Sequence, residues 1–252
     1  VMQANESLYF NLRLMITPFK PLDTHRHFSS RYCHAYRPID EVDEMGANLI
    51  NIHHATDINP YINYPFLTPE VLKRYVDEAH EKDKQVKLYY TVREITTRTP
   101  ELFALHSLGG EILVDGEGGG HAWLQEHMGR NYIAAWYALQ VRDTSVINGV
   151  LSRWHNFYVK GLDWLAKNIE IDGVYIDDLG FGREVMQRVR RVLHRHRGDP
   201  VMDLHSANQF NEKDGFASST NLYLEHFPYF DRLWFGEYFN YDAKPDYWLV
   251  EM

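Results

Sequence analysis

The stretch Asp172-Gly173-Val174-Tyr175-Ile176-Asp177-Asp178 decides the fold that this sequence predicts. Its middle is a short apolar run of β-branched and aromatic residues, which is typical of a buried β-strand. A long helical segment precedes it, from about Thr144 to Asn168, and another follows from Arg183 to Arg197. Helical patterns on both sides of a short apolar strand indicate the β-α units that build parallel sheets.

The same alternation of short apolar runs and longer amphipathic segments continues along the chain. Six strands are predicted, at Leu8 to Thr17, Asn48 to His54, Val86 to Val92, Gly173 to Asp178, Val201 to His205 and Arg232 to Glu237. Several are apolar almost throughout, as strands buried on both faces of a sheet are. No glycine-rich phosphate turn follows the first, which disfavours an open doubly wound sheet. We predict the α/β class and an incomplete (β/α)8 TIM-type barrel with about six β-α units.

The length of 252 residues suits a single large domain. The chain begins with Val1 and ends at Met252, inside a helical pattern that has no stop signal. We expect residues 1–252 to be one partial catalytic β/α barrel domain that is a fragment of a longer multidomain protein.

Charge and composition narrow the possible partners. The formal net charge is −9, and the longest basic stretch, Arg188 to Arg197, reads as the solvated face of one helix, so no nucleic-acid partner is expected. Aromatic residues make up 14% of the chain, which suits either stacking on sugar rings or an aromatic core. No run approaches the roughly 20 apolar residues of a membrane helix, and no signal peptide is visible. Cys33 is the only cysteine.

Five consecutive predicted strands end in polar or ionisable groups, and the carboxyl ends of parallel strands gather at one rim. Asp177 and Glu237 are therefore predicted as a catalytic pair, because glycoside hydrolysis needs two carboxyl groups flanking one bond. Asp177 is expected as nucleophile or electrostatic stabiliser and Glu237 as general acid/base. Asp178 is either a third catalytic candidate or an anchor, and in the structural alternative it caps the next helix while Asp177 pairs with Arg183.

The remaining rim residues are predicted to bind substrate: His53, His54, Tyr90, Arg93, His121, Trp123, His205 and Trp234. Two of them, His121 and Trp123, belong to a long irregular stretch after the third strand, and long stretches of that kind are usually functional or disordered. His25, His27 and His34 are expected to be ordinary surface residues of a loop.

Two other functions remain open at this point. A non-catalytic carbohydrate-binding barrel would show the same rim without a suitably spaced carboxyl pair. A metal-dependent hydrolase or isomerase would use His53, His54, His205 and Asp177 as ligands, but no spaced metal motif supports it. We predict no metal and no cofactor.

Three runs of the sequence resemble large bacterial proteins grouped with glycoside hydrolase family 123. They are SRWHNFYVKGLDWL (152–165), DGVYIDDLGFGREVMQRVR (172–190) and NLYLEHFPYFDRLWFGEYFNY (221–241). The resemblance extends from about Phe10 to the end of the chain. It implies a (β/α)8 barrel flanked by β-sandwich modules, and it favours a periplasmic or secreted location.

The resemblance also implies an activity, the retaining exo-hydrolysis of β-linked N-acetylgalactosamine. In that family the acetamido group of the substrate attacks the anomeric carbon, assisted by an adjacent Asp-Glu pair. Asp177 and Asp178 stand where this pair is sought, but the second member is one methylene shorter here. The departure puts the substrate-assisted mechanism and the hexosaminide specificity in question, and leaves a conventional pair of Asp177 with Glu237 open.

Overall fold

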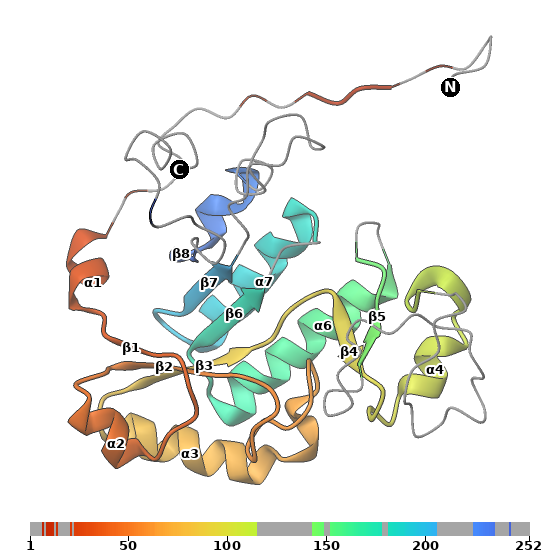
Figure 1. Ribbon diagram of the computed structural model, residues 1–252. Helices are drawn as coiled ribbons and strands as arrows, with labels where there is room; N and C mark the ends of the chain where they lie inside the picture. Colours follow the sequence, from red (N-terminus) through yellow and green to blue (C-terminus); the bar gives the residue numbers. More distant parts are fainter. Residues whose placement is uncertain are drawn as a thin grey trace.

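The computed structural model describes residues 7, 9–12, 14, 21, 23–114, 143–148, 152–177, 181–205, 224–234 and 242. Six strands within these residues form one sheet: β1 (Tyr32–Cys33), β2 (Leu49–Ile52), β3 (Gln85–Tyr89), β6 (Gly173–Asp177), β7 (Val201–His205) and β8 (Arg232–Trp234). Their order in the sheet is the order of the chain, and every neighbouring pair is parallel. The sheet curls as a half-barrel (Figure 1), which confirms the predicted fold class.

Helices connect the strands. The α-helices are α1 (Thr24–Ser29), α2 (Ile39–Glu44), α3 (Pro69–Glu81), α4 (Leu102–His106), α6 (Arg153–Trp164) and α7 (Arg183–His196). Shorter helical segments are η1 (Pro65–Leu67), η2 (Gly109–Glu111), η3 (Leu165–Ile169, a π-helical turn that extends α6) and η5 (Leu224–Tyr229). After β3, the strands β4 (Glu94–Thr96) and β5 (Asp143–Ser145) form a separate antiparallel pair.

Helix α3 shows how the sequence specifies one of these connections. Pro69 is its first residue, where the missing N–H leaves no helical hydrogen bond unmade. Its buried residues Leu72, Tyr75, Val76 and Ala79 follow the spacing of one helix face. The preceding Thr68 does not cap the helix with its side chain; its hydroxyl donates to the carbonyl of Ile58 at 3.0 Å instead.

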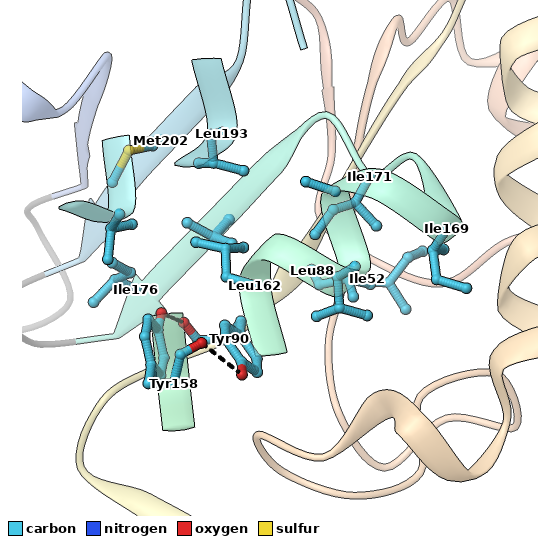
Figure 2. Packing of buried hydrophobic residues seen from close by; sticks show 14 of the residues in the cluster. Ile52, Leu88, Tyr90, Tyr158, Leu162, Ile169, Ile171, Ile176, Leu193 and Met202 are labelled. Carbon is cyan, nitrogen blue, oxygen red and sulfur yellow. Dashed lines mark hydrogen bonds between the residues drawn. The ribbon is translucent and has the colours of Figure 1, made fainter. Parts of the chain in front are cut away.

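The two faces of the sheet differ in chemistry. On the face toward the helices, Ile52, Leu88 and Ile176 join the main hydrophobic core (Figure 2). The other face, here called the inner face, carries the alternate residues, among them the buried Lys87 and Asp203. The strands are therefore buried on both faces as expected, but the inner face mixes polar and charged residues with apolar and aromatic ones.

Gly173 marks a close approach between two central strands. A Cβ atom at this position would lie 1.7 Å from the backbone oxygen of Val201 on β7. Only a residue without a side chain fits there, and the strand that carries Asp177 can lie beside β7 for this reason.

The first strand differs from the prediction. Within the expected strand Leu8 to Thr17, the described residues 9–12 and 14 have no regular structure, and Tyr9 and Leu12 are 90% and 94% exposed. The first strand of the sheet is β1, which has two residues and pairs with β2. The expected helix from Thr144 begins only at Arg153, because residues 143–145 form β5.

Candidate active site at the carboxyl ends of the strands

Asp177 ends β6 on the inner face, and its carboxylate is held from two neighbouring strands. The hydroxyl of Tyr89 on β3 donates to Oδ2 at 2.7 Å. Nδ1 of His205 on β7 lies 2.8 Å from Oδ1, so this nitrogen donates to the carboxylate. The backbone oxygen of Asp177 accepts a hydrogen bond from the Thr91 hydroxyl at 2.8 Å. Both the side chain and the backbone of Asp177 are thus fixed.

The surroundings keep Asp177 ionised. Burial raises the pKa of this carboxyl, but the hydrogen bonds from His205 and Tyr89 and the nearby charges lower it further than burial raises it. The pKa of Asp177 therefore lies below its ordinary value. Arg93 places a guanidinium nitrogen 3.9 Å from Oδ2, and the Asp177 side chain is 26% exposed. The site offers a negatively charged, partly accessible carboxylate.

Imidazole and aromatic rings surround this carboxylate on the inner face. His34, directly after β1, and His53, directly after β2, approach each other to 2.8 Å between their Nε2 atoms. The ring centre of Tyr175 lies 5.0 Å from that of His34 and 5.8 Å from that of His53. Trp234 packs 5.8 Å from His34 and also lines a cavity of about 580 Å³ that α1 helps to form beside β8. These rings form one cluster beside Asp177 on the inner face.

A buried ion pair on the inner face contacts the residues that carry these rings. Lys87 and Asp203 contact each other and are fully inaccessible to solvent. Asp203 also accepts hydrogen bonds from the Tyr32 hydroxyl at 2.6 Å and from the indole nitrogen of Trp234 at 2.9 Å. Burial lowers the pKa of Lys87, and the charge of Asp203 opposes that shift. The orientation of the Trp234 ring is thus tied to a charged pair in the barrel interior.

The structure brings five predicted site residues to this cluster in addition to Asp177: His53, His54, Arg93, His205 and Trp234. It does not bring Tyr90 there. Tyr90 is 1% exposed on the helix side, where its ring stacks on Tyr158 with centres 4.4 Å apart (Figure 2). Asp178, Glu237, His121 and Trp123 lie outside the described residues.

The alternative partner expected for Asp177 is not found. Arg183 donates to the hydroxyl of Tyr229 at 2.8 Å. The cation beside Asp177 in the described part of the chain is Arg93.

The residues predicted from the sequence do not include Tyr89, Tyr175 and His34, which belong to the cluster. The prediction names Tyr90 in place of Tyr89, because position at the end of a strand does not distinguish two successive tyrosines. It places His34 in a loop, because the two-residue strand before it has no detectable pattern. The available signal was position: a polar residue that directly follows a strand of a parallel sheet lies at its carboxyl end.

The described residues contain no group of three or more His, Cys, Asp or Glu side chains placed to hold a metal ion. The expectation that His53, His54, His205 and Asp177 converge as ligands therefore gains no support from their geometry. No helix in the same part of the chain is long and apolar enough to cross a membrane.

The architecture is similar to that of solved TIM-barrel structures. A debranching enzyme from Nostoc punctiforme, soaked with acarbose, shares 14% identity, with 69% of this chain and 40% of that chain covered and a TM-score of 0.50. An α-amylase from Geobacillus thermoleovorans, complexed with acarbose, shares 17% identity, with coverages of 67% and 38% and a TM-score of 0.45. The chain thus spans less than half the length of these two proteins, and at such identities the likeness shows the fold alone.

The family follows from the sequence itself. The model of the glycoside hydrolase 123 TIM-barrel domain matches residues 23–252. The chain belongs to this family, which confirms the predicted resemblance. No curated protein is similar enough to match the chain.

Proposed function

We propose that this chain carries the active site of a glycoside hydrolase that cleaves a glycan or glycoconjugate, with Asp177 at its centre. The observation that supports the proposal most directly is the state of Asp177, a carboxylate held ionised at the carboxyl end of a central barrel strand. Membership of a glycoside hydrolase family points to the same chemistry. The transition state of glycoside hydrolysis carries positive charge on the sugar, which a fixed carboxylate stabilises.

The hydrogen bonds at Asp177 favour the role of stabiliser over that of nucleophile. Both carboxylate oxygens accept hydrogen bonds, from Tyr89 and His205, which holds the group in place and makes it a weaker nucleophile. An enzyme of this design needs another group to attack the anomeric carbon. The acetamido group of an N-acetylhexosaminide supplies one, so we extend the proposal to this substrate class.

A second carboxyl is needed to protonate the departing oxygen. Asp178, the next residue of the chain, and Glu237, after β8, are the two candidates. The shorter side chain of Asp178 places its carboxyl nearer the backbone than a glutamate would. Glu237 remains the alternative, as general acid/base from a different strand.

The rings around Asp177 are the proposed sugar contacts. Trp234 offers a flat face, and His53, His54, Arg93 and His205 offer polar groups at the same rim. Binding by His121 and Trp123 remains a prediction from the sequence. Tyr90 is withdrawn from this set because it is buried on the opposite face.

The test compares hydrolysis of 4-nitrophenyl N-acetyl-β-galactosaminide and 4-nitrophenyl β-galactoside by the complete protein. We expect turnover only of the first, because the second lacks the acetamido group. Asp177→Asn should lower kcat by about 100-fold or more, as the loss of an electrostatic stabiliser does. Asp199→Asn is the matched control, since this carboxylate pairs with Arg26 on the surface.

Three outcomes separate the alternatives. Equal turnover of both substrates would refute the substrate-assisted mechanism but not the glycosidase. Full activity of Asp177→Asn would refute the central role of this residue. Glycan binding without turnover by the unaltered protein would identify a non-catalytic carbohydrate-binding barrel. Whichever of Asp178→Asn and Glu237→Gln loses more activity with substrates that have poor leaving groups identifies the general acid.

A further inference from the structure

The contact between His34 and His53 requires a single proton between two rings. The two Nε2 atoms lie 2.8 Å apart, which is hydrogen-bonding distance. A neutral imidazole carries a proton on one nitrogen and a lone pair on the other. One ring must therefore donate through Nε2 while the other accepts through Nε2. The direction of this hydrogen bond fixes the tautomer of both rings.

Both rings are neutral in the folded protein. Burial lowers the pKa of His34, and the nearby charge of Lys87 lowers it further, while Asp203 and Asp177 oppose the shift. Burial lowers the pKa of His53 to about 4, with smaller contributions from His34 and His54. Double protonation of both rings would also place two N–H groups head to head at Nε2. Near neutral pH the pair is therefore an uncharged donor and an uncharged acceptor.

Asn51 determines which ring donates. It lies on β2, its side chain is completely buried, and its Nδ2 faces Nδ1 of His34 at 3.5 Å. An amide nitrogen only donates, so Nδ1 of His34 is the acceptor and its proton resides on Nε2. His34 then donates to Nε2 of His53, and the proton of His53 resides on Nδ1. The direction runs from Asn51 through His34 to His53.

We propose that Asn51 and His34 are positioning residues that make His53 a hydrogen-bond donor, through Nδ1, to an oxygen atom of the bound ligand beside Asp177. Among the described residues no side chain forms a hydrogen bond to Nδ1 of His53. The site then combines a directed neutral donor with an ionised acceptor, Asp177. A sugar hydroxyl or acetamido carbonyl oxygen suits the donor. The identity of the ligand rests on the proposed function; the tautomer of His53 does not.

The tautomers can be read without a substrate. Nitrogen NMR of protein labelled with ¹⁵N-histidine distinguishes protonated from unprotonated ring nitrogens, and loss of signals in His34→Phe and His53→Phe assigns the two rings. We expect His53 to be protonated on Nδ1 and His34 on Nε2 at neutral pH. Protonation of His53 on Nε2 would show that the Asn51 amide is turned round, and it would overturn the proposal. So would a doubly protonated ring.

Asn51→Leu tests whether Asn51 sets the direction of the hydrogen bond between His34 and His53. The substitution keeps the branched shape and the number of side-chain heavy atoms, and it removes the donor without adding charge. We expect His53 to become a mixture of tautomers, and an unchanged His53 spectrum would refute the role of Asn51. Asn48→Leu is the matched control: it makes the same change just before β2, where Asn48 contacts Ser29 and Arg31. The His53 signals should not move in this control.

Ligand binding gives the functional readout. With 4-nitrophenyl N-acetyl-β-galactosaminide, we expect Asn51→Leu to raise KM roughly three- to tenfold, the effect of one neutral hydrogen bond, with kcat nearly unchanged. An unchanged KM would show that His53 does not donate to this ligand. If the unaltered protein hydrolyses no such substrate, the proposed function fails, while the NMR result still decides the tautomers.

Discussion

The variant Tyr89→Phe tests most directly a point on which the structure and the prediction from the sequence differ. The substitution removes one hydroxyl, which donates to Oδ2 of Asp177 at 2.7 Å, and leaves the ring in place. Sequence reasoning chose the neighbouring Tyr90 as the site residue, but that side chain is buried on the opposite face of the strand. The same change at two adjacent positions thus has different expected effects.

The magnitude follows from the hydrogen bond that is lost. A hydrogen bond to a charged group contributes about 1.5–3 kcal/mol, and the lower figure applies here because the Asp177 side chain is 26% exposed. A loss of about 1.4 kcal/mol changes an ionisation equilibrium roughly tenfold. The hydrogen bond favours the ionised form, so its loss raises the pKa of Asp177. Protonation then occurs at a higher pH than in the unaltered enzyme.

The assay is the pH dependence of kcat/KM. On the acidic limb, where activity follows the ionised fraction of Asp177, Tyr89→Phe should retain roughly one tenth of the activity at a given pH. At neutral pH the two enzymes should differ little. Tyr90→Phe, the control, should leave the acidic limb in place, since Tyr90 contacts Tyr158 and not Asp177. An acidic limb that stays in place in Tyr89→Phe, or moves equally in both variants, would refute the assignment of Tyr89.

Three further predictions concern stability. Gly173→Ala should destabilise the fold by at least the upper end of the usual 1–3 kcal/mol for overpacking, measured by urea unfolding, because its Cβ would meet Val201 at 1.7 Å. Lys87→Met should cost about 3–5 kcal/mol in the same assay by leaving Asp203 buried without its cation. Adding Asp203→Leu should restore only part of the loss, because the Tyr32 hydroxyl and the Trp234 indole then lose their acceptor. His53 has a folded pKa of about 4 against 6.5 in the unfolded chain, so as the pH falls through this window the unfolded state takes up the proton first and stability declines. Unfolding measured across the window should show His53→Phe reducing that slope, by up to about 1.4 kcal/mol per pH unit.

The central strands could be predicted from the sequence because each is a short apolar run between helical patterns. The predicted bounds of Val201 to His205 match β7, and the predicted strand from Gly173 matches β6 as far as Asp177, the last residue described there. The first strand failed for a physical reason. Leu8 to Thr17 is a longer and more apolar segment than Tyr32–Cys33. A segment becomes a strand of the sheet only when a neighbouring strand pairs with it, and β2 pairs with the two residues of β1.

The position of Asp177 could be predicted, but its partners could not. The end of a strand can be recognised from the sequence alone, whereas the neighbours of a carboxylate depend on the register between strands. Tyr89 faces Asp177 because β3 and β6 pair with Tyr89 opposite Tyr175. A shift by one residue would put Tyr90 on the inner face instead. The alternation of the apolar Val86 and Leu88 with Lys87 is the signal within β3 that puts Tyr89 on the inner face.

The polar inner face explains why these strands can serve stability and function separately. Along β6, the residues toward the helices, Val174 and Ile176, belong to the hydrophobic core, while Tyr175 and Asp177 point to the site. The core is thus formed mainly between the sheet and its helices, which leaves the inner face open to charged and hydrogen-bonding groups. Such groups are tolerated in a barrel interior only when they are paired, as Lys87 and Asp203 are. A barrel built in this way can change the residues of its site with little change to the packing that holds the sheet together.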